Sequence, residues 1–399
     1  MKEQLAIFGG TPVRSEKIYY GRQWINEDDV KAVSEVLTSD YLTTGPRAAQ
    51  LEAELCAYTG ASYATVCANG TAALHIAAMA AGIGEGDEVI TTALTFMASA
   101  NCALYCGAVP VFADIDRETY NIDPASIEAR ITNKTKAVVA VDYAGCSIDH
   151  AAIRDICDRH GLIFIEDAAH AIGTSDHGKM VGSIADMTCF SFHPVKTVTA
   201  GEGGAVLTNN AEYHHKLQIL RSHGIEHEEE FMTEAPHEGP WYYEQQMLGY
   251  NYRLTDFQSA LLSSQLKRID MFAGRRKAIA ARYDEAFGEL PGIILQQELP
   301  DTDSVRHLYE IRLDFDVLAC TRREFFDAMS AENVQCQIHY VPVYWMPYYK
   351  RLGHKEGECP VCEEIYRGIL SIPFYPKMTD RDVEDTIHAV RKIVEYYRK

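Results

Sequence analysis

Hydrophobic positions in the middle of the chain alternate between short, continuous apolar runs and amphipathic stretches. Between residues 87 and 209, apolar runs rich in β-branched residues predict buried strands at 89–92, 109–112, 137–141 and 162–165. An amphipathic stretch at 151–157, followed by Gly161, predicts one of the helices between them. Strands and helices that alternate in this way predict βαβ units and a mostly parallel sheet.

The pattern changes after about residue 251. Helical stretches at 254–270 and 272–290 lead to Pro291-Gly292, which predicts a hinge or turn. The elements expected beyond it are a strand at 307–315, a helix at 322–332, a strand at 334–340 and a closing helix at 380–397. The sequence therefore predicts an α/β protein in three parts: an N-terminal segment (1–30), a large sheet domain (31–253) and a smaller α+β domain (254–399).

Residues 226–246 carry many acidic and several aromatic side chains without a clear period. This composition predicts a solvated loop, and a flap over a binding site is the alternative.

Composition narrows the classes of function. The 399 residues include 37 basic and 57 acidic side chains, a net charge of −20, which argues against nucleic-acid binding and against adhesion to an anionic membrane. The longest apolar run, 72–83, is too short to cross a bilayer, and the first fourteen residues lack the apolar core of a signal peptide. Eleven cysteines, an odd number, favour reduced thiols. We therefore expect a cytoplasmic protein, and an enzyme.

Candidate catalytic residues occur directly after the predicted strands, because ligands of parallel sheets bind at the carboxyl ends of the strands. The strand at 162–165 runs into Glu166 and Asp167, and a buried carboxylate here requires a cationic partner. Lys196 ends the next predicted strand, just before the glycine-rich stretch 201–204. A desolvated lysine at such a position is a candidate nucleophile, although a surface lysine would give the same local pattern.

Together these residues match the requirements of pyridoxal phosphate (PLP). A carboxylate such as Asp167 must keep the pyridine nitrogen protonated so that the ring can accept electrons, and a lysine such as Lys196 must bond the aldehyde. The helix that begins at Gly70-Thr71 offers free N–H groups for the phosphate. Phe96, just after a predicted strand, is placed to cover the ring.

At this point the chain resembles the sugar aminotransferases of the DegT/DnrJ/EryC1/StrS family, from about Tyr19 to Arg398. The motifs that carry the resemblance occur in the family's order at 42–46, 69–74, 86–90, 166–170, 190–196 and 201–204. The resemblance implies the fold-type-I architecture of aspartate aminotransferase, PLP as cofactor, and a homodimer with active sites at its interface.

The resemblance also implies a role for each matching residue. Lys196 matches the lysine that carries the cofactor, and Asp167 matches the partner of the pyridine nitrogen. The other implied cofactor ligands are Gly70, Thr71, Phe96, His170, Ser191 and, reaching the neighbouring subunit's phosphate, Asn251. The implied substrate ligands are Tyr20, Tyr41, Leu42, Thr43, Arg253, His339 and Tyr340. No metal is implied.

Within the family, the stretches 141–145, 190–196, 220–224 and 337–344 are most similar to aminotransferases of the pseudaminic acid pathway. This similarity implies a UDP-linked 4-keto-6-deoxy-N-acetylhexosamine as acceptor and L-glutamate as amino donor. An aminotransferase for a dTDP- or GDP-linked keto sugar, or an inert relative that only binds PLP or a sugar nucleotide, are the alternatives. Some members remove a hydroxyl instead and carry histidine in place of the lysine, and Lys196 argues against that branch.

Cys359 and Cys362 form a CxxC motif that is compatible with half a zinc site or a redox pair. A zinc site needs four ligands, and the chain has no second CxxC. We therefore predict that these cysteines have no role in metal binding or redox chemistry.

Overall fold

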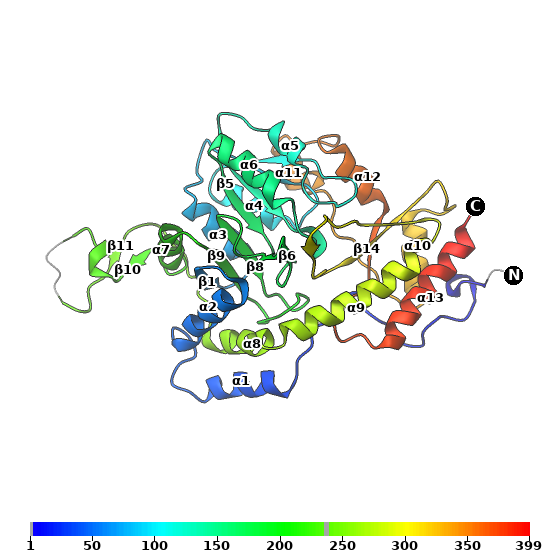
Figure 1. Cartoon of the computed structure of the whole chain (residues 1–399), viewed down its shortest axis with the longest axis horizontal. Coiled ribbons are helices and arrows are strands. Elements are labelled where there is room, and N and C mark those ends of the chain that lie inside the picture. The colour runs from blue at the N-terminus through cyan, green and yellow to red at the C-terminus, as the bar shows by residue number, and fades with distance from the viewer. Residues whose placement is uncertain (1–2, 235–238) are drawn as a thin grey trace.

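A seven-stranded sheet lies at the centre of the molecule (Figure 1), whose computed structural model describes residues 3–234 and 239–399. Its strands, in spatial order, are β1 (Tyr63–Cys67), β9 (Gly204–Thr208), β8 (Met187–Ser191), β5 (Ile163–Asp167), β4 (Thr135–Val141), β2 (Glu88–Thr92) and β3 (Val109–Ala113). The pairings from β8 to β3 are parallel, and β9 runs antiparallel to both of its neighbours. The four strands predicted from apolar runs are confirmed as β2, β3, β4 and β5.

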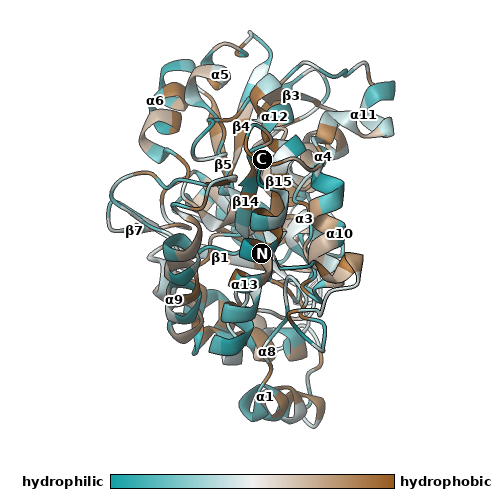
Figure 2. Ribbon diagram, turned by 90° about the vertical axis from the view of Figure 1, so that its right-hand side faces the viewer, coloured by the Kyte–Doolittle hydropathy of each residue, from teal (hydrophilic) through white to brown (hydrophobic). Residues whose placement is uncertain are grey.

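Helices cover both faces of this sheet because successive strand residues point to opposite sides. Ile165 packs on one face, against α3 (Gly70–Ala80), α4 (Ala98–Tyr105) and α7 (Ala211–Leu220). Phe164 packs on the other face, against α6 (His150–His160). That second face is completed by α2 (Pro46–Thr59) and α8 (Asp256–Leu266), and α1 (Glu27–Leu37) packs on α8. Surface helices turn their hydrophilic sides outward (Figure 2).

The predicted helix at 151–157 is α6, and its ends follow local signals. The side chain of Asp149 accepts the N–H of Ala152 at the first turn. Gly161 ends the helix in the left-handed region, at φ 65°, where a side chain would be strained.

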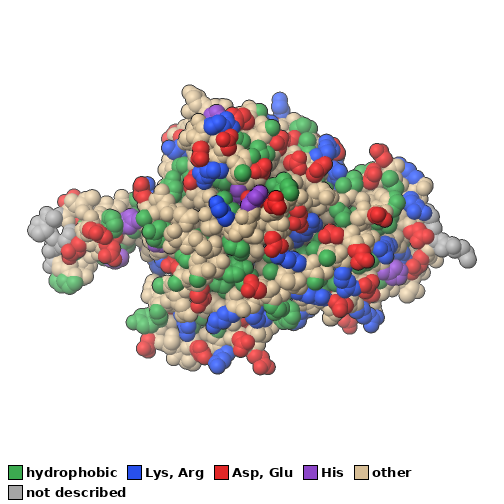
Figure 3. Space-filling view, viewed as in Figure 1, with side chains coloured by type: hydrophobic (Ala, Val, Ile, Leu, Met, Phe, Trp, Pro, Cys, Tyr) green, Lys and Arg blue, Asp and Glu red, His purple; other side chains and the backbone are tan. Residues whose placement is uncertain are grey.

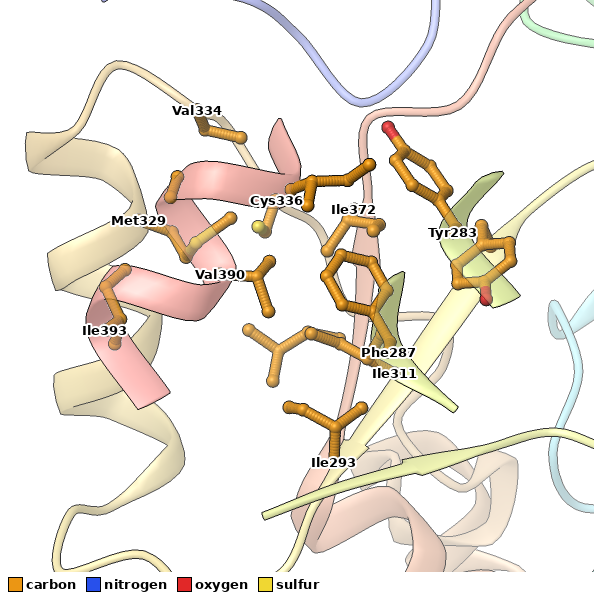
Figure 4. Packing of buried hydrophobic residues seen from close by; sticks show 14 of the residues in the cluster. Tyr283, Phe287, Ile293, Ile311, Met329, Val334, Cys336, Ile372, Val390 and Ile393 are labelled. Carbon is orange, nitrogen blue, oxygen red and sulfur yellow. The ribbon is translucent and has the colours of Figure 1, made fainter. Parts of the chain in front are cut away.

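A smaller, three-stranded antiparallel sheet forms the second core. Its strands are β12 (Ile293–Leu295), β14 (Tyr309–Leu313) and β15 (Ile369–Ile372), and it packs against α9 (Ile269–Phe287), α10 (Arg322–Ala331) and α13 (Asp380–Tyr397). Figure 4 shows Phe287, Ile311 and Ile372 meeting in this core. The predicted strand at 307–315 and the predicted helices at 322–332 and 380–397 are confirmed.

The predicted strand at 334–340 is wrong. This segment makes only two isolated bridges, from Val334 to Ile18 and from Gln337 to Ser371. Val334 and Cys336 are buried in the smaller core, which explains the strand-like alternation of the sequence. Gln337 pairs with Ser371 on the outer edge of β15 through two backbone hydrogen bonds of 3.0 and 2.9 Å, but the segment then continues to His339 and Tyr340 in the central cleft instead of extending this pairing.

The described residues of the segments 225–234 and 239–245 form an arm that projects from the body (Figure 1). Two short strands, β10 (Ile225–Glu226) and β11 (Glu244–Gln245), pair at its base. Acidic and hydrophobic side chains lie together on the arm (Figure 3), and Trp241 is 71% exposed. None of the described arm residues lines the central cleft of this chain, which agrees with the loop interpretation rather than with a flap over the chain's own site.

A buried ion pair fastens the N-terminal segment to the smaller core. Nζ of Lys392 lies 3.0 Å from a carboxylate oxygen of Glu332, and both side chains are fully buried. The two oxygens of Glu332 also accept the backbone N–H groups of Ala6 and Val13, each at 2.9 Å. This anchor precedes Tyr20, which reaches the central cleft.

The remaining described elements lie around these two cores. They are η1 (Ala6–Phe8), α5 (Pro124–Glu128), η2 (Tyr143–Gly145), β6 (Ser175–Asp176), β7 (Lys179–Met180), η3 (Glu229–Phe231), β13 (Thr302–Asp303), η4 (Val343–Trp345), α11 (Pro347–Arg351) and α12 (Pro360–Gly368). Among the described helices, none has both the length and the apolar character that a membrane span requires.

Candidate active site

A cleft of about 910 Å³ opens where β4, β5 and β8 end and α3 begins. Most of the predicted ligands line this one space: Tyr20, Gly70, Thr71, Phe96, Asp167, His170, Ser191, Lys196, His339 and Tyr340. Residues far apart in sequence are therefore brought together at the carboxyl ends of the strands, as the sequence predicts.

Five predicted ligands lie outside this cleft. Tyr41 and Leu42 are 56% and 49% exposed, and Thr43 beside them is also exposed. Arg253 donates to Oγ of Ser222 at 2.9 Å and lines a second cavity of about 540 Å³. Asn251 is exposed, although its neighbours Tyr250 and Tyr252 line the main cleft. Roles for these five residues in this chain's own cleft are not supported by its geometry.

Asp167 is the last residue of β5, and its carboxylate is held by two hydrogen bonds. Oδ2 accepts the hydroxyl of Ser99 at 2.6 Å, and Oδ1 accepts the N–H of Ala169 at 3.2 Å. Burial raises the pKa of Asp167, and both bonds act against this rise by stabilising the charged form. Ser99 was not predicted, and its only signal in the sequence is its place one turn after Thr95, whose hydroxyl it meets at 2.8 Å.

Lys196 lies in the turn after β8 rather than at the strand's end, which is a correction to the predicted position. The strand ends at Ser191, and the N–H of Lys196 donates to the carbonyl of His193 at 2.9 Å. Burial lowers the pKa of the Lys196 amine to about 8, Arg276 acts in the same direction, and Asp167 opposes the shift. A lowered pKa leaves more of the amine unprotonated near neutral pH, as a nucleophile requires.

The start of α3 leaves room for an anion. Asn69 accepts the N–H of Ala72 at 2.8 Å and so caps the helix, which leaves the N–H groups of Gly70 and Thr71 to a ligand. A Cβ at Gly70 would lie 2.8 Å from Cβ of Ser191, closer than packing allows. The absence of a side chain at position 70 is thus what lets the serine approach the helix start.

Aromatic rings close the cleft. Phe96 is 53% exposed, and its ring centre lies 6.1 Å from that of Tyr340. His170 contacts the hydroxyl of Tyr340 through Nε2 at 3.4 Å, while its buried Nδ1 has no partner. The His170 ring lies 4.6 Å from that of His307, a residue that the sequence analysis missed because nothing local marks it. Burial, and then Lys196, hold the pKa of His170 well below its usual range, so the ring is neutral.

The sequence predicts a cationic partner for a carboxylate at the end of β5. The structure has such a partner, and it pairs with Glu166 rather than with Asp167. Nε2 of His150 lies 2.5 Å from Glu166, and Nδ1 lies 3.0 Å from Asp176. Burial alone would lower the pKa of His150, and the surrounding carboxylates, with Glu166 first, raise it to about 9. Because Glu166 and Asp167 alternate along the strand, this pair lies on the face opposite Asp167.

Cys359 and Cys362 are fully buried at the start of α12. The carboxylate of Asp114 accepts the N–H groups of Val361 and Cys362, each at 2.9 Å, and so already occupies the helix start. Burial raises the pKa of both thiols, the reverse of what a reactive cysteine needs.

The residues of the cleft fit PLP. Asp167 would hold the pyridine nitrogen and Lys196 the aldehyde carbon, while Phe96 would cover the ring. The phosphate fits the start of α3, where Gly70 and Ser191 leave the space that a Cβ would fill. The unpartnered Nδ1 of His170 is a further polar atom available to the cofactor or to a substrate.

Comparison with known proteins identifies the family. The sequence model of the DegT/DnrJ/EryC1/StrS aminotransferase family matches residues 23–391. SpsC of Bacillus subtilis, a spore coat polysaccharide biosynthesis protein, is 42% identical over 96% of this chain and 98% of its own. Helicobacter pylori PseC, an aminotransferase involved in the biosynthesis of pseudoaminic acid, is 33% identical with a TM-score of 0.88, covering 96% of this chain and all of that chain. The PLP form of the putative sugar aminotransferase Spr1654 from Streptococcus pneumoniae is 28% identical with a TM-score of 0.88, covering 95% of this chain and 99% of that chain. The chain thus belongs to the DegT/DnrJ/EryC1/StrS family and is a PLP-dependent aminotransferase of fold type I.

Proposed function

We propose that this enzyme transfers an amino group from L-glutamate to the 4-keto group of a UDP-linked 4-keto-6-deoxy-N-acetylhexosamine, in pseudaminic acid biosynthesis. The observation that carries the proposal is the similarity to PseC over nearly the whole of both chains. The proposed place of action is the cytoplasm, because all eleven cysteines are free thiols, which stay reduced there.

Bound PLP supplies an electron sink for the carbon that loses its proton. The residues of the chain supply the rest. Nζ of Lys196, with a pKa of about 8, would take the proton from the α-carbon of the donor in the first half-reaction. In the second half-reaction the same lysine would return a proton to the carbon of the sugar that gains the amino group. Asp167, held by Ser99 and Ala169, would keep the ring nitrogen protonated.

The cleft is large enough for a cofactor and part of a sugar nucleotide, but it is poor in cations. Among the described residues that line it, Lys196 is the only lysine or arginine. A UDP diphosphate therefore needs positive charge from elsewhere. We propose that it comes from a second copy of the chain in a homodimer, whose exposed Asn251 and neighbouring Arg253 would face this cleft.

A second candidate substrate is a keto sugar on another nucleotide, dTDP or GDP. SpsC, at 42% identity, is more similar in sequence than PseC, at 33%, and its name points to a spore coat polysaccharide rather than to pseudaminic acid. Residues that contact the sugar vary more readily than those that hold the cofactor, so family membership does not decide between these substrates.

A panel of UDP-, dTDP- and GDP-linked 4-keto sugars tests the proposal, with single turnovers followed by the absorbance of the cofactor. We expect kcat/KM for the UDP-linked keto sugar that gives the L-altro amino sugar to exceed that for its D-xylo epimer by more than about tenfold, because a site that hydrogen-bonds specific hydroxyls rejects analogues that leave polar groups unpaired. Equal efficiency with both epimers, or activity only with a dTDP sugar, would contradict the proposed substrate. Replacing L-glutamate by other amino acids in the first half-reaction tests the donor separately.

A further inference from the structure

A chain of three polar side chains runs from the smaller sheet to the cleft. Glu310 on β14 and Ser371 on β15 are directly paired across the two strands. Oγ of Ser371 lies 2.5 Å from Oε1 of Glu310 and 2.6 Å from Nδ1 of His339, within hydrogen-bond distance of both. His339 lines the cleft. Because Nδ1 is engaged by the serine, Nε2 is the nitrogen that His339 can offer to a ligand.

In the described part of the chain, no lysine or arginine lies within ion-pair distance of Glu310, and His339 is the basic side chain nearest to it. The side chain of Glu310 is fully buried, Oε2 has no hydrogen-bond partner, and Nδ1 of His339 is 4.0 Å from Oε1. Oε1 also lies 3.2 Å from the hydroxyl of Tyr143, and that hydroxyl donates to the backbone carbonyl of His339. A charged carboxylate is costly in such surroundings, so the neutral, protonated form is favoured.

The hydroxyl of Ser371 links the protonation of Glu310 to the tautomer of His339. A hydroxyl donates one proton. When Glu310 is ionised, Ser371 donates to it and accepts from Nδ1–H of His339, which leaves Nε2 without a proton. When Glu310 carries a proton on Oε1, it donates to Ser371, Ser371 donates to Nδ1, and Nε2 carries the proton that faces the cleft.

We propose that Glu310, Ser371 and His339 form a proton relay that ends at Nε2 of His339 and serves the keto substrate. The Nε2–H bond breaks and an O–H bond forms on the substrate's carbonyl oxygen, which takes the π electrons of the C=O bond as the incoming amine bonds to carbon. Nδ1 takes the proton of Ser371, Ser371 takes the proton of Glu310, and Glu310 becomes a carboxylate. His339 is then the catalytic residue, and Glu310 and Ser371 are positioning residues. The relay serves the carbonyl of the keto sugar, whatever its nucleotide, and so rests on the proposed function only for this class of acceptor.

The pKa values of Glu310 and His339 agree with this assignment. Burial raises the pKa of Glu310 to about 8, and burial, followed by the nearby Lys196, lowers the pKa of His339 to about 4. Between these values the proton resides on Glu310, from where it can be delivered. The other titratable groups around the relay are Tyr20, Tyr120, Tyr143, His170, His307, Cys336 and Tyr340.

The first test is chemical modification of the PLP-loaded enzyme without substrate. Diethyl pyrocarbonate acylates only an imidazole nitrogen that carries no proton. The rate at His339, read by peptide mass spectrometry against the exposed His388, should rise from about pH 6 to about pH 9 with a midpoint near the pKa of Glu310, about 8. In Glu310→Gln, which cannot titrate, the rate should stay flat. A flat profile in the wild type, or a rise that persists in Glu310→Gln, overturns the proposal.

The second test separates the two half-reactions. Glu310→Gln and Ser371→Ala should lower kcat/KM for the keto substrate by about 10²-fold, the scale of general acid catalysis, and leave the half-reaction with the amino donor at the wild-type rate. Ser371→Thr keeps the hydroxyl and should restore activity. Glu363→Gln, another buried Glu→Gln change but in α12, is the matched folding control. Equal loss in both half-reactions, or failure of Ser371→Thr to restore what Ser371→Ala loses, contradicts the relay. If Glu310→Gln does not fold, the Ser371 pair decides.

Discussion

The hydroxyl of Ser99 donates a 2.6 Å hydrogen bond to Oδ2 of Asp167, and both side chains are buried. This bond has a clear electrostatic direction, because it stabilises the carboxylate and not the acid. Burial raises the pKa of Asp167, so Ser99 helps to keep charged the one group that is placed to hold a pyridinium nitrogen.

Ser99→Ala should therefore weaken the electron sink without removing it. Losing one hydrogen bond to a charged group costs about 1.5–3 kcal/mol, which corresponds to about one to two units in the pKa of Asp167. We expect turnover to fall by about tenfold to a hundredfold, and Ser99→Thr, which keeps the hydroxyl, to fall less. Asp167→Asn should lower turnover by orders of magnitude while PLP remains bound. Steady-state rates with parallel measurement of bound PLP check this, and unchanged turnover in Asp167→Asn would remove its assigned role.

Lys196 should react with PLP in a pH range unusual for a lysine. Only the unprotonated amine attacks an aldehyde, and burial lowers the pKa of this amine to about 8. The rate at which apoprotein and PLP develop a visible absorption band should therefore rise with pH and level off above about 8. Lys196→Ala should develop no band that borohydride bleaches. A rate that continues to rise toward the pKa of an ordinary lysine would mean that the amine is not desolvated.

Features that depend on the local pattern of residues can be predicted from the sequence. The apolar runs predict β2 to β5 because buried parallel strands are continuous hydrophobic segments, and Asp167 follows from its place at the end of such a run. Ser99, His307 and Glu310 could not be predicted in this way, since each acts through a partner far away in sequence. The error at 334–340 arises because the alternation reflects burial: the segment joins β15 by the single bridge from Gln337 to Ser371 and then continues to the cleft.

Lys392 and Glu332 should contribute to stability as a pair. Removing one member leaves the other as an uncompensated buried charge, which costs about 3–5 kcal/mol. Lys392→Met should lower the free energy of unfolding by about that amount, as measured by urea denaturation followed by fluorescence.

The double variant Lys392→Met, Glu332→Gln should recover part of this loss, because no charge remains buried. It should not recover all of it, since the carboxylate also accepts the N–H groups of Ala6 and Val13. If the double variant is less stable than Lys392→Met, the ion pair is not what fastens the N-terminal segment.

The position of Asn251 predicts that active sites are shared between two subunits. Asn251 is exposed outside its own cleft, while Tyr250 and Tyr252 on either side of it line that cleft. The arm exposes the apolar side chains of Phe231 at 46%, Trp241 at 71% and Tyr243 at 55%, and Leu248, just after the arm, is 72% exposed. A second copy of the chain would cover these surfaces and bring its own Asn251 to the phosphate.

Mixing Lys196→Ala chains with Asn251→Ala chains, after separation and reassociation, tests this arrangement. A hybrid dimer places both lesions in one site and leaves the other site intact, so random mixing of equal amounts should give about a quarter of the wild-type activity from two weakly active parents. If each cleft used only its own residues, the mixture would show no more than the average of the parents. The same result would follow if the enzyme were active as a monomer, and sedimentation at assay concentration distinguishes that case, because a fully active monomer would leave Asn251 with no cleft to reach.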